Sequence, residues 1–163
     1  MQFKPALVKL VDDIVKKVIE VIEVAEAQPE AFLGHDEVGY LYSVLGIFAC
    51  NQNYVDEEKR YQILDWAVSR LLQQLATCPP DNVDKMSRIV LTIKTTTKGF
   101  KKELTGKFVN LFKITIEQLV PLLSKYMNHQ MLVKQIIFFV QSNVTTLGLE
   151  ILPVMQQLLL LCI

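Results

Sequence analysis

The chain has 163 residues, of which 51% are hydrophobic and 21% are charged. This length indicates one domain or a segment of a longer protein, and so much apolar content excludes intrinsic disorder. Seventeen basic and seventeen acidic side chains give a net charge of zero, so the total charge points to no class of partner.

The two halves of the sequence differ in charge. Residues 1–80 carry 7 basic and 12 acidic side chains, and residues 81–163 carry 10 basic and 5 acidic ones. The halves therefore have net charges of −5 and +5.

The first predicted helix spans residues 5–26, where Pro5 suits the first turn. Acidic and basic residues spaced by four predict the ion pairs Asp12 with Lys16 and Asp13 with Lys17. Apolar residues cover more than half of the helical wheel. We therefore expect this helix to be sandwiched between neighbours.

Two further helices follow a connector at residues 28–34. Asp36 is expected to cap the second helix, which ends at the break of residues 51–55. Asp56 begins the third, whose apolar stripe runs to about Ala76 and stops at Pro79 and Pro80.

Four helices are predicted in the second half. Asp81 is expected to cap the fourth helix, and the fifth runs from Phe108 to Leu123. Residues 129–145 form the sixth, and Gly148 separates it from the last. The expected apolar positions of the sixth helix are Ile136, Ile137, Val140 and Val144. Pro121 and Pro153 lie within the apolar patterns of the fifth and last helices and are expected to kink them.

The predicted fold class is all-α, with about seven antiparallel helices. Helix pairs begin near Asp36, Asp81 and Asn128, a spacing of about 45 residues that is typical of HEAT and armadillo repeats. Residues 1–163 then form one α-α superhelix domain, with an orphan helix at 5–26 and pairs at 36–77, 81–125 and 129–163. Both ends are apolar, which indicates that they stack on neighbouring repeats of a longer array or on a partner. A compact seven-helix bundle is the alternative.

Residues for catalysis are not recognisable in the sequence. His35 and His129 are far from any metal-ligand partner, and the three cysteines, at 50, 78 and 162, follow no metal-binding spacing. We therefore expect reduced thiols in an intracellular protein, with no cofactor, no metal and no enzymatic activity. No apolar stretch reaches the roughly 18 residues of a membrane span, so no membrane association is expected.

A basic segment lies between residues 85 and 113. It holds eight basic side chains and one acidic one, Glu103. Five of the lysines are candidate contacts to the phosphates of an RNA backbone: Lys94, Lys98, Lys101, Lys102 and Lys107. Thr95, Thr96 and Thr97 could add donors, and Phe100 could stack on a base or fill an apolar pocket. The alternatives are a solvated face balanced by the acidic first half, or a contact to an acidic protein surface.

Three stretches, in the same order, resemble a central HEAT-repeat segment of the exportin-T family, the tRNA exporters of the karyopherin-β (importin-β) superfamily. They are residues 34–54, with Gly34-His35-Asp36, Leu41-Tyr42, Gly46, Asn51 and Tyr54; Thr97-Lys98-Gly99-Phe100; and Leu147-Gly148-Leu149-Glu150-Ile151-Leu152-Pro153. The likeness covers roughly residues 34–157.

The resemblance implies a HEAT-repeat receptor, here in part, that binds tRNA together with Ran-GTP and moves between nucleus and cytoplasm. Nuclear pore proteins are further partners that it suggests. It implies packing roles for Leu41, Tyr42, Gly46 and Phe100, and leaves Lys98 as the matched position suited to a phosphate contact. Another karyopherin, or a generic HEAT-repeat scaffold for protein partners, is the alternative.

Overall fold

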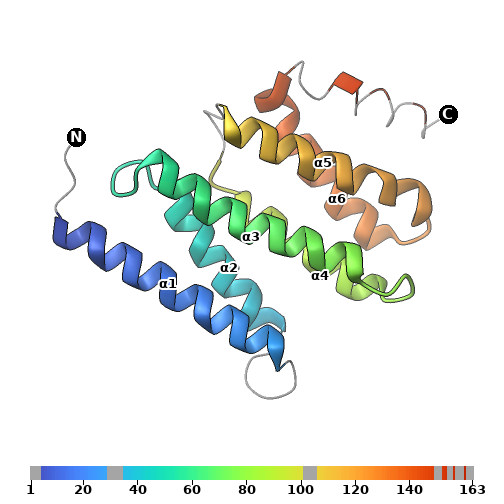
Figure 1. Cartoon of the computed structure of the whole chain (residues 1–163). Coiled ribbons are helices and arrows are strands. Elements are labelled where there is room, and N and C mark those ends of the chain that lie inside the picture. Colours follow the sequence, from blue (N-terminus) through green and yellow to red (C-terminus); the bar gives the residue numbers. More distant parts are fainter. Residues whose placement is uncertain are drawn as a thin grey trace. The chain divides into compact units, whose positions relative to one another are not determined.

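The structure is a computed structural model that describes residues 5–28, 35–100 and 106–148, and beyond them residues 152, 153, 156 and 160. At positions 35 and 144–146 it describes the backbone only. Within these ranges every regular element is a helix (Figure 1). The predicted all-α class is therefore confirmed.

Six helices are described in these ranges. They are α1 (Pro5–Ala27), α2 (His35–Cys50), α3 (Glu57–Thr77), α4 (Val83–Thr97), α5 (Lys107–Lys125) and α6 (Gln130–Leu147). Their bounds lie close to those predicted from apolar spacing and from the breaks at residues 51–55 and 79–80. Most of the last predicted helix and most of the first connector lie outside the described residues.

Side-chain caps explain where two of the helices begin. The Asp56 carboxylate accepts a hydrogen bond of 2.8 Å from the backbone N–H of Lys59, at the start of α3. At the start of α4 the cap is the Asn82 side chain, whose oxygen accepts a hydrogen bond of 3.3 Å from the backbone N–H of Lys85. The prediction that Asp81 caps this helix is therefore wrong by one residue.

The chain divides into two compact units. Unit 1 comprises Met1–Ala67 and Thr95–Gly99, and unit 2 comprises Val68–Lys94 and Phe100–Ile163. The helices α3 and α4 each contribute residues to both units. The assignment of helices to repeat pairs within one domain stays a prediction.

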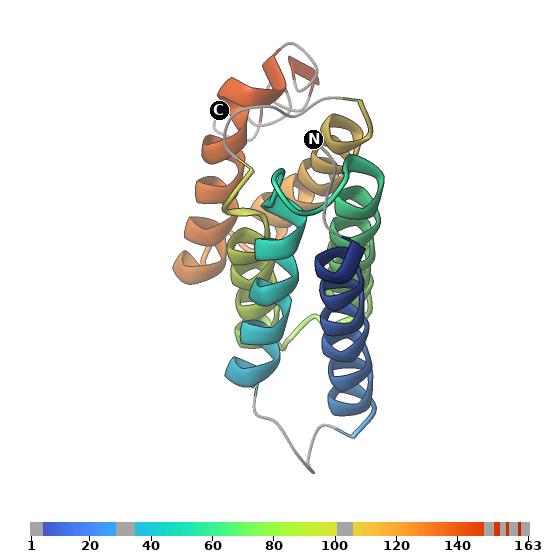
Figure 2. The same ribbon diagram turned by 90° about the vertical axis from the view of Figure 1, so that its left-hand side faces the viewer.

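In unit 1, α1 packs along α2, and the two helices run side by side in Figures 1 and 2. Ile22 of α1, Leu45 of α2 and Leu64 of α3 are fully buried in this unit. The ring of Tyr42 lies 6.2 Å from that of Trp66, and its hydroxyl donates a hydrogen bond to Glu26. The core of this unit is thus largely apolar, and the Tyr42 hydroxyl at its edge has a hydrogen-bond partner.

The charged face of α1 is paired differently from the prediction. Asp12 forms an ion pair of 3.2 Å with Lys59 of α3, and Lys17 pairs with Glu20 at 3.3 Å. The predicted pair of Asp12 with Lys16 is therefore wrong, because α3 brings a lysine to the same carboxylate.

In unit 2, α5 packs along α6. The rings of Phe112 and Phe139 stack at 6.2 Å with an angle of 1° between their planes, and both side chains are 1% exposed. The hydroxyl of Tyr126, just after α5, donates to the backbone oxygen of Pro80 at 3.1 Å. This bond ties the end of α5 to the turn that precedes α4.

Among the described residues no helix is both long enough and apolar enough to cross a membrane.

Candidate nucleic-acid interface

The predicted phosphate contacts lie at the end of α4, in the connector that follows and at the start of α5. The structure describes Lys94, Lys98 and Lys107, whereas Lys101 and Lys102 lie outside the described residues. Lys98 belongs to unit 1, and Lys94 and Lys107 belong to unit 2.

Lys98 is exposed in the turn directly after α4. The next residue, Gly99, lies so close to the end of α2 that a Cβ added there would be 2.5 Å from the Sγ of Cys50. The absence of a side chain at Gly99 thus lets the turn lie against α2. Lys98 projects from a turn that packing holds in place, as a phosphate contact requires.

Lys94 and Lys107 have different surroundings in unit 2. The ammonium of Lys94 lies 4.8 Å from the centre of the Phe138 ring, and this side chain is half-buried. Lys107 is exposed at the first residue of α5, after Gly106 with φ of 51°. Of these two, Lys107 is the more accessible to a phosphate.

The threonines of the basic segment do not all face solvent. Thr96 and Thr97 are 1% and 7% exposed, so the prediction that they donate to phosphate is wrong. Thr95 is exposed, and its hydroxyl accepts a hydrogen bond of 3.4 Å from Ser43. Burial of the last turn of α4 in unit 1 removes two of the three expected donors.

Phe100 fills an apolar pocket in unit 2. Its ring centre lies 5.3 Å from that of Phe108 and 6.0 Å from that of Phe112, and it is 8% exposed. Of the two interpretations left open by the sequence, packing is confirmed. Phe100 is not available to stack on a base.

The end of α4 and the turn after it lie against α2 in unit 1. A Cβ added to Gly46 of α2 would lie 2.2 Å from the backbone oxygen of Thr96. This approach and that of Gly99 to Cys50 place residues 46–50 against residues 96–99. The expected packing roles of Tyr42 and Gly46 are confirmed.

The thiol of Cys50 is held in its neutral form by this packing. Burial raises its pKa from 9.0 to about 11, although the Arg60 guanidinium and the backbone N–H of Gly99 act in the opposite direction. Arg60 itself is buried and donates from Nε to the carbonyl of Ala49 at 2.8 Å. A neutral thiol is a poor nucleophile, so this group has no evident catalytic part.

Other chemical groups are sparse. No cluster of three or more histidine, cysteine or acidic side chains suited to a metal occurs in the part of the chain that the structure describes. His129 is exposed, with its ring 5.9 Å from that of Tyr126. The structure does not describe the side chain of His35.

The outer surface of α6 differs from the prediction. Ile137 was expected in the core, but it is 49% exposed, and its neighbour Phe138 is 41% exposed. Leu132, Ile136 and Phe139 are buried instead. The sequence contains the signal, because Met127, Met131 and Phe138 form a second apolar stripe at helical spacing.

Comparison of the chain with protein-family models, with curated proteins and with solved structures found no match to any of them.

Proposed function

We propose that this chain is part of a nuclear export receptor of the exportin-T type, which binds tRNA together with Ran-GTP and carries it from nucleus to cytoplasm. The observation that carries the proposal is the contact between two stretches that resemble this family, at Gly99 with Cys50, next to the close approach of Gly46 to Thr96. Residues that match a family pattern at separate places in a sequence are more informative when they also meet in space.

The helix arrangement supports this proposal. In the predicted pairing, the packing of α1 on α2 and of α5 on α6 is contact between neighbouring repeats, and stacking of this kind builds HEAT and armadillo superhelices. In a superhelix of this type, neighbouring repeats of a longer chain and nuclear pore proteins would be further partners. The proposed protein binds and releases its cargo and does not catalyse.

RNA contact is assigned to the lysines of the basic segment. Lys98 and Lys107 are exposed, and Lys101 and Lys102 lie between them in the sequence. Lysine contacts of this kind neutralise phosphates without reading bases. Contacts of this kind suit a cargo recognised by its shape and backbone, as tRNA is.

The test measures binding of fluorescently labelled tRNA to the full chain, with Ran-GTP or with Ran-GDP. Ran-GTP is expected to raise the tRNA affinity, because two ligands that bind one conformation cooperatively raise each other's affinity. A triple charge reversal, Lys98→Glu, Lys101→Glu and Lys102→Glu, should weaken tRNA binding by about tenfold or more.

A matched variant controls for the change in total charge. Lys9→Glu, Lys16→Glu and Lys17→Glu, on the exposed face of α1, alter the net charge equally and should change the affinity much less. If both triple variants bind tRNA alike, the RNA site is misplaced. If the wild-type chain binds tRNA equally with Ran-GTP and Ran-GDP, the assignment as an exporter fails.

A protein-binding scaffold is the second candidate. Large apolar side chains are exposed on α2, where Tyr40 and Ile47 are 77% and 66% exposed, and on α6, where Met131 is 64% exposed. Exposed apolar patches mark protein interfaces more often than RNA contacts. This candidate predicts capture of a protein partner whose binding depends weakly on salt.

A further inference from the structure

The helix α2 is apolar on its solvent side as well as on its buried side. From Val38 to Cys50 its sequence contains no charged residue. Tyr40 and Ile47 are 77% and 66% exposed, and Val44 between them is half-buried. Because these three positions recur every three or four residues, they form one stripe, here called the α2 stripe. Helices that are apolar on every side are normally covered on every side.

The N-terminal end of the α2 stripe is negatively charged. Asp36 lies four residues before Tyr40, on the same side of the helix, and is exposed. Glu37 beside it is exposed as well. The sequence of α2 contains neither lysine nor arginine, so no basic side chain of this helix offsets the two carboxylates.

The C-terminal end of the stripe is bordered by a positive charge, Lys98. The end of α4 runs along α2 here, because the Ser43 hydroxyl donates to that of Thr95 at 3.4 Å. Further along, a Cβ added to Gly99 would lie 2.5 Å from the Sγ of Cys50, the last residue of α2. Lys98 directly precedes Gly99 and is exposed. The two ends of the stripe therefore have opposite charges.

The acidic start of α3 approaches α2 from another side. Arg60, near the start of α3, donates from Nε to the carbonyl of Ala49 at 2.8 Å. Ala49 is buried and lies two positions after Ile47, and residues spaced by two point to opposite sides of a helix. The first turn of α3 therefore lies away from the stripe.

Asp36 and Lys98 cannot pair within one copy of the chain. Asp36 and Cys50 are fourteen positions apart, so the two ends of the stripe are separated by about 21 Å at 1.5 Å per residue. A two-fold axis across the middle of α2 would place a second α2 antiparallel to the first. Asp36 of each copy would then meet Lys98 of the other, and Tyr40 would face Ile47.

We propose that the α2 stripe is a contact between two copies of this chain, packed antiparallel, with Asp36 of each copy paired with Lys98 of the other. Few side chains take part, so the contact belongs to the small, transient class of interfaces that bury less than about 1,200 Å². A dimer is therefore expected in concentrated solution. The inference does not rest on the proposed binding of tRNA, and its measurements contain no RNA.

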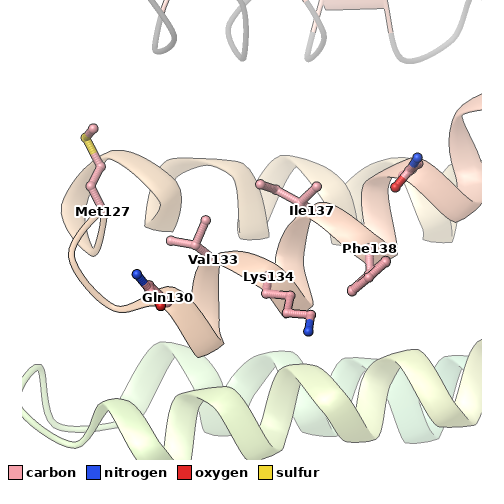
Figure 3. Close-up of a pocket in the computed structure, with 7 residues that line it drawn as sticks. Met127, Gln130, Val133, Lys134, Ile137 and Phe138 are labelled. Carbon is pink, nitrogen blue, oxygen red and sulfur yellow. The ribbon is translucent and has the colours of Figure 1, made fainter.

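The charge pattern of the α2 stripe selects a second copy, whereas that of the apolar groove along α6 in unit 2 does not. The groove has a volume of about 420 Å³, and Lys134 is the charged residue of its lining (Figure 3). From Gln130 to Leu147, α6 contains neither Asp nor Glu. A symmetric contact between two such helices would therefore bring like charges together.

Sedimentation equilibrium of the full chain tests the proposal. The chain should be monomeric at about 10 μM and populate a dimer near 1 mM, as expected of a small interface. Ile47→Asp should weaken dimerisation at least about tenfold, because it buries a carboxylate in an apolar contact. Met131→Asp, at a position on α6 that is 64% exposed, should leave dimerisation unchanged.

Two charge reversals test the pairing across the contact. Asp36→Lys alone, or Lys98→Glu alone, places like charges at both ends of the contact and should weaken the dimer about fivefold. An equimolar mixture of the two variants forms a heterodimer in which both pairs are opposite again, and should associate like the wild-type chain. Lys9→Glu, on the exposed face of α1, controls for net charge and should dimerise normally.

Four results would overturn the proposal. The first is a chain that stays monomeric near 1 mM, which would assign the stripe to a different protein. The second is a dimer that Ile47→Asp does not weaken. The third is a mixture of the two charge variants that associates no better than either alone. The fourth is a monomer whose urea midpoint falls sharply on Ile47→Asp, which would assign the stripe to other residues of the same chain.

Discussion

Gly46 occupies a place in α2 where no other residue fits without movement of the backbone. An added Cβ would be 2.2 Å from the oxygen and 2.9 Å from the carbonyl carbon of Thr96. Because these are backbone atoms of another helix, they cannot move aside as the end of a flexible side chain can. The glycine therefore sets how closely α2 approaches the end of α4 in unit 1.

Gly46→Ala should lower the free energy of unfolding by about 2 kcal/mol, the usual cost of forcing extra volume into a packed contact. Urea denaturation followed by circular dichroism measures this change in the free energy of unfolding. Ile47→Ala, one position on and 66% exposed, introduces the same residue into the same helix and should change stability by less than about 0.5 kcal/mol. A rise in stability for Gly46→Ala, as helix propensity alone predicts, would contradict the close contact.

Cys50 adds a pH dependence to the stability of unit 1. Its pKa is about 11 in the folded chain against 9.0 for an ordinary thiol, so folding favours the protonated form. The contribution of this thiol is therefore complete below pH 9 and is lost as the pH rises from 9 to 11.

The measurement is the difference in urea midpoint between the wild-type chain and Cys50→Ala, from pH 7 to pH 11. This difference should be constant up to about pH 9 and then change in favour of the variant, which has no thiol to ionise. Taking the difference cancels the titration of tyrosines and lysines that both chains share. A difference that stays constant to pH 11 would show that the Cys50 thiol has the same pKa in the folded and in the unfolded chain.

At the scale of the helices, apolar periodicity and breaking residues predicted α1 to α6 to within a few residues. These signals succeed because hydrogen bonding within a helix and termination at proline depend on neighbours in the sequence. The start of α4 was less well predicted, because Asp81 and Asn82 are both good capping residues. Only the hydrogen bond from Lys85 to Asn82 distinguishes them.

Asn82→Ala should therefore lower the free energy of unfolding by about 1 kcal/mol, the typical cost of losing a helix cap. Asp81 is adjacent, exposed and of similar shape, and Asp81→Ala should lower the free energy of unfolding by only a few tenths of that amount. Thermal or urea denaturation of the two variants measures both effects. If Asp81→Ala lowers the free energy of unfolding as much as Asn82→Ala or more, Asp81 is the capping residue, as predicted from the sequence.

The face of α6 that is buried could not be predicted from its sequence, because the helix has two apolar stripes. Ile136 and Phe139 are buried, and Ile137 and Phe138 are exposed. Both stripes have helical spacing, so a hydrophobic pattern alone does not rank them. The aromatic stack of Phe112 on Phe139 shows which stripe faces the neighbour.

At the scale of the whole molecule, the zero net charge combines an acidic first half with a basic second half. Binding of RNA to the basic segment would release counterions from the phosphates, and each contact would add to the salt dependence of binding. An apolar protein contact lacks this dependence. Salt therefore separates the two functions proposed for the chain.

For tRNA binding by the full chain, we expect the affinity to fall steeply between about 50 and 200 mM salt. Reversal of charge at Lys98, Lys101 and Lys102 should flatten the slope of log affinity against log salt by about 2 to 3, one for each lost contact. Fluorescence anisotropy at several salt concentrations measures the slope. The same slope in the wild-type chain and the triple variant would exclude these three lysines as phosphate contacts.

The candidate site was predictable only in part, for a similar reason. Clustering of lysines around residues 94–107 is visible in the sequence, and the exposure of Lys98 and Lys107 agrees with it. Burial of Thr96 and Thr97 is not visible there, because it depends on α2 packing over the end of α4. The half-burial of Lys94 over Phe138 likewise needs a helix some forty positions further along the chain.

The sequence by itself determined the all-helical class, the places where helices begin and end, and the basic segment, since these follow from local spacing and composition. Only the tertiary structure decided which apolar stripe of α6 is buried, that Asp12 pairs with Lys59 and not Lys16, and that Gly46 lies against Thr96. Each of these depends on residues far apart in the chain, whose approach is set by packing between helices.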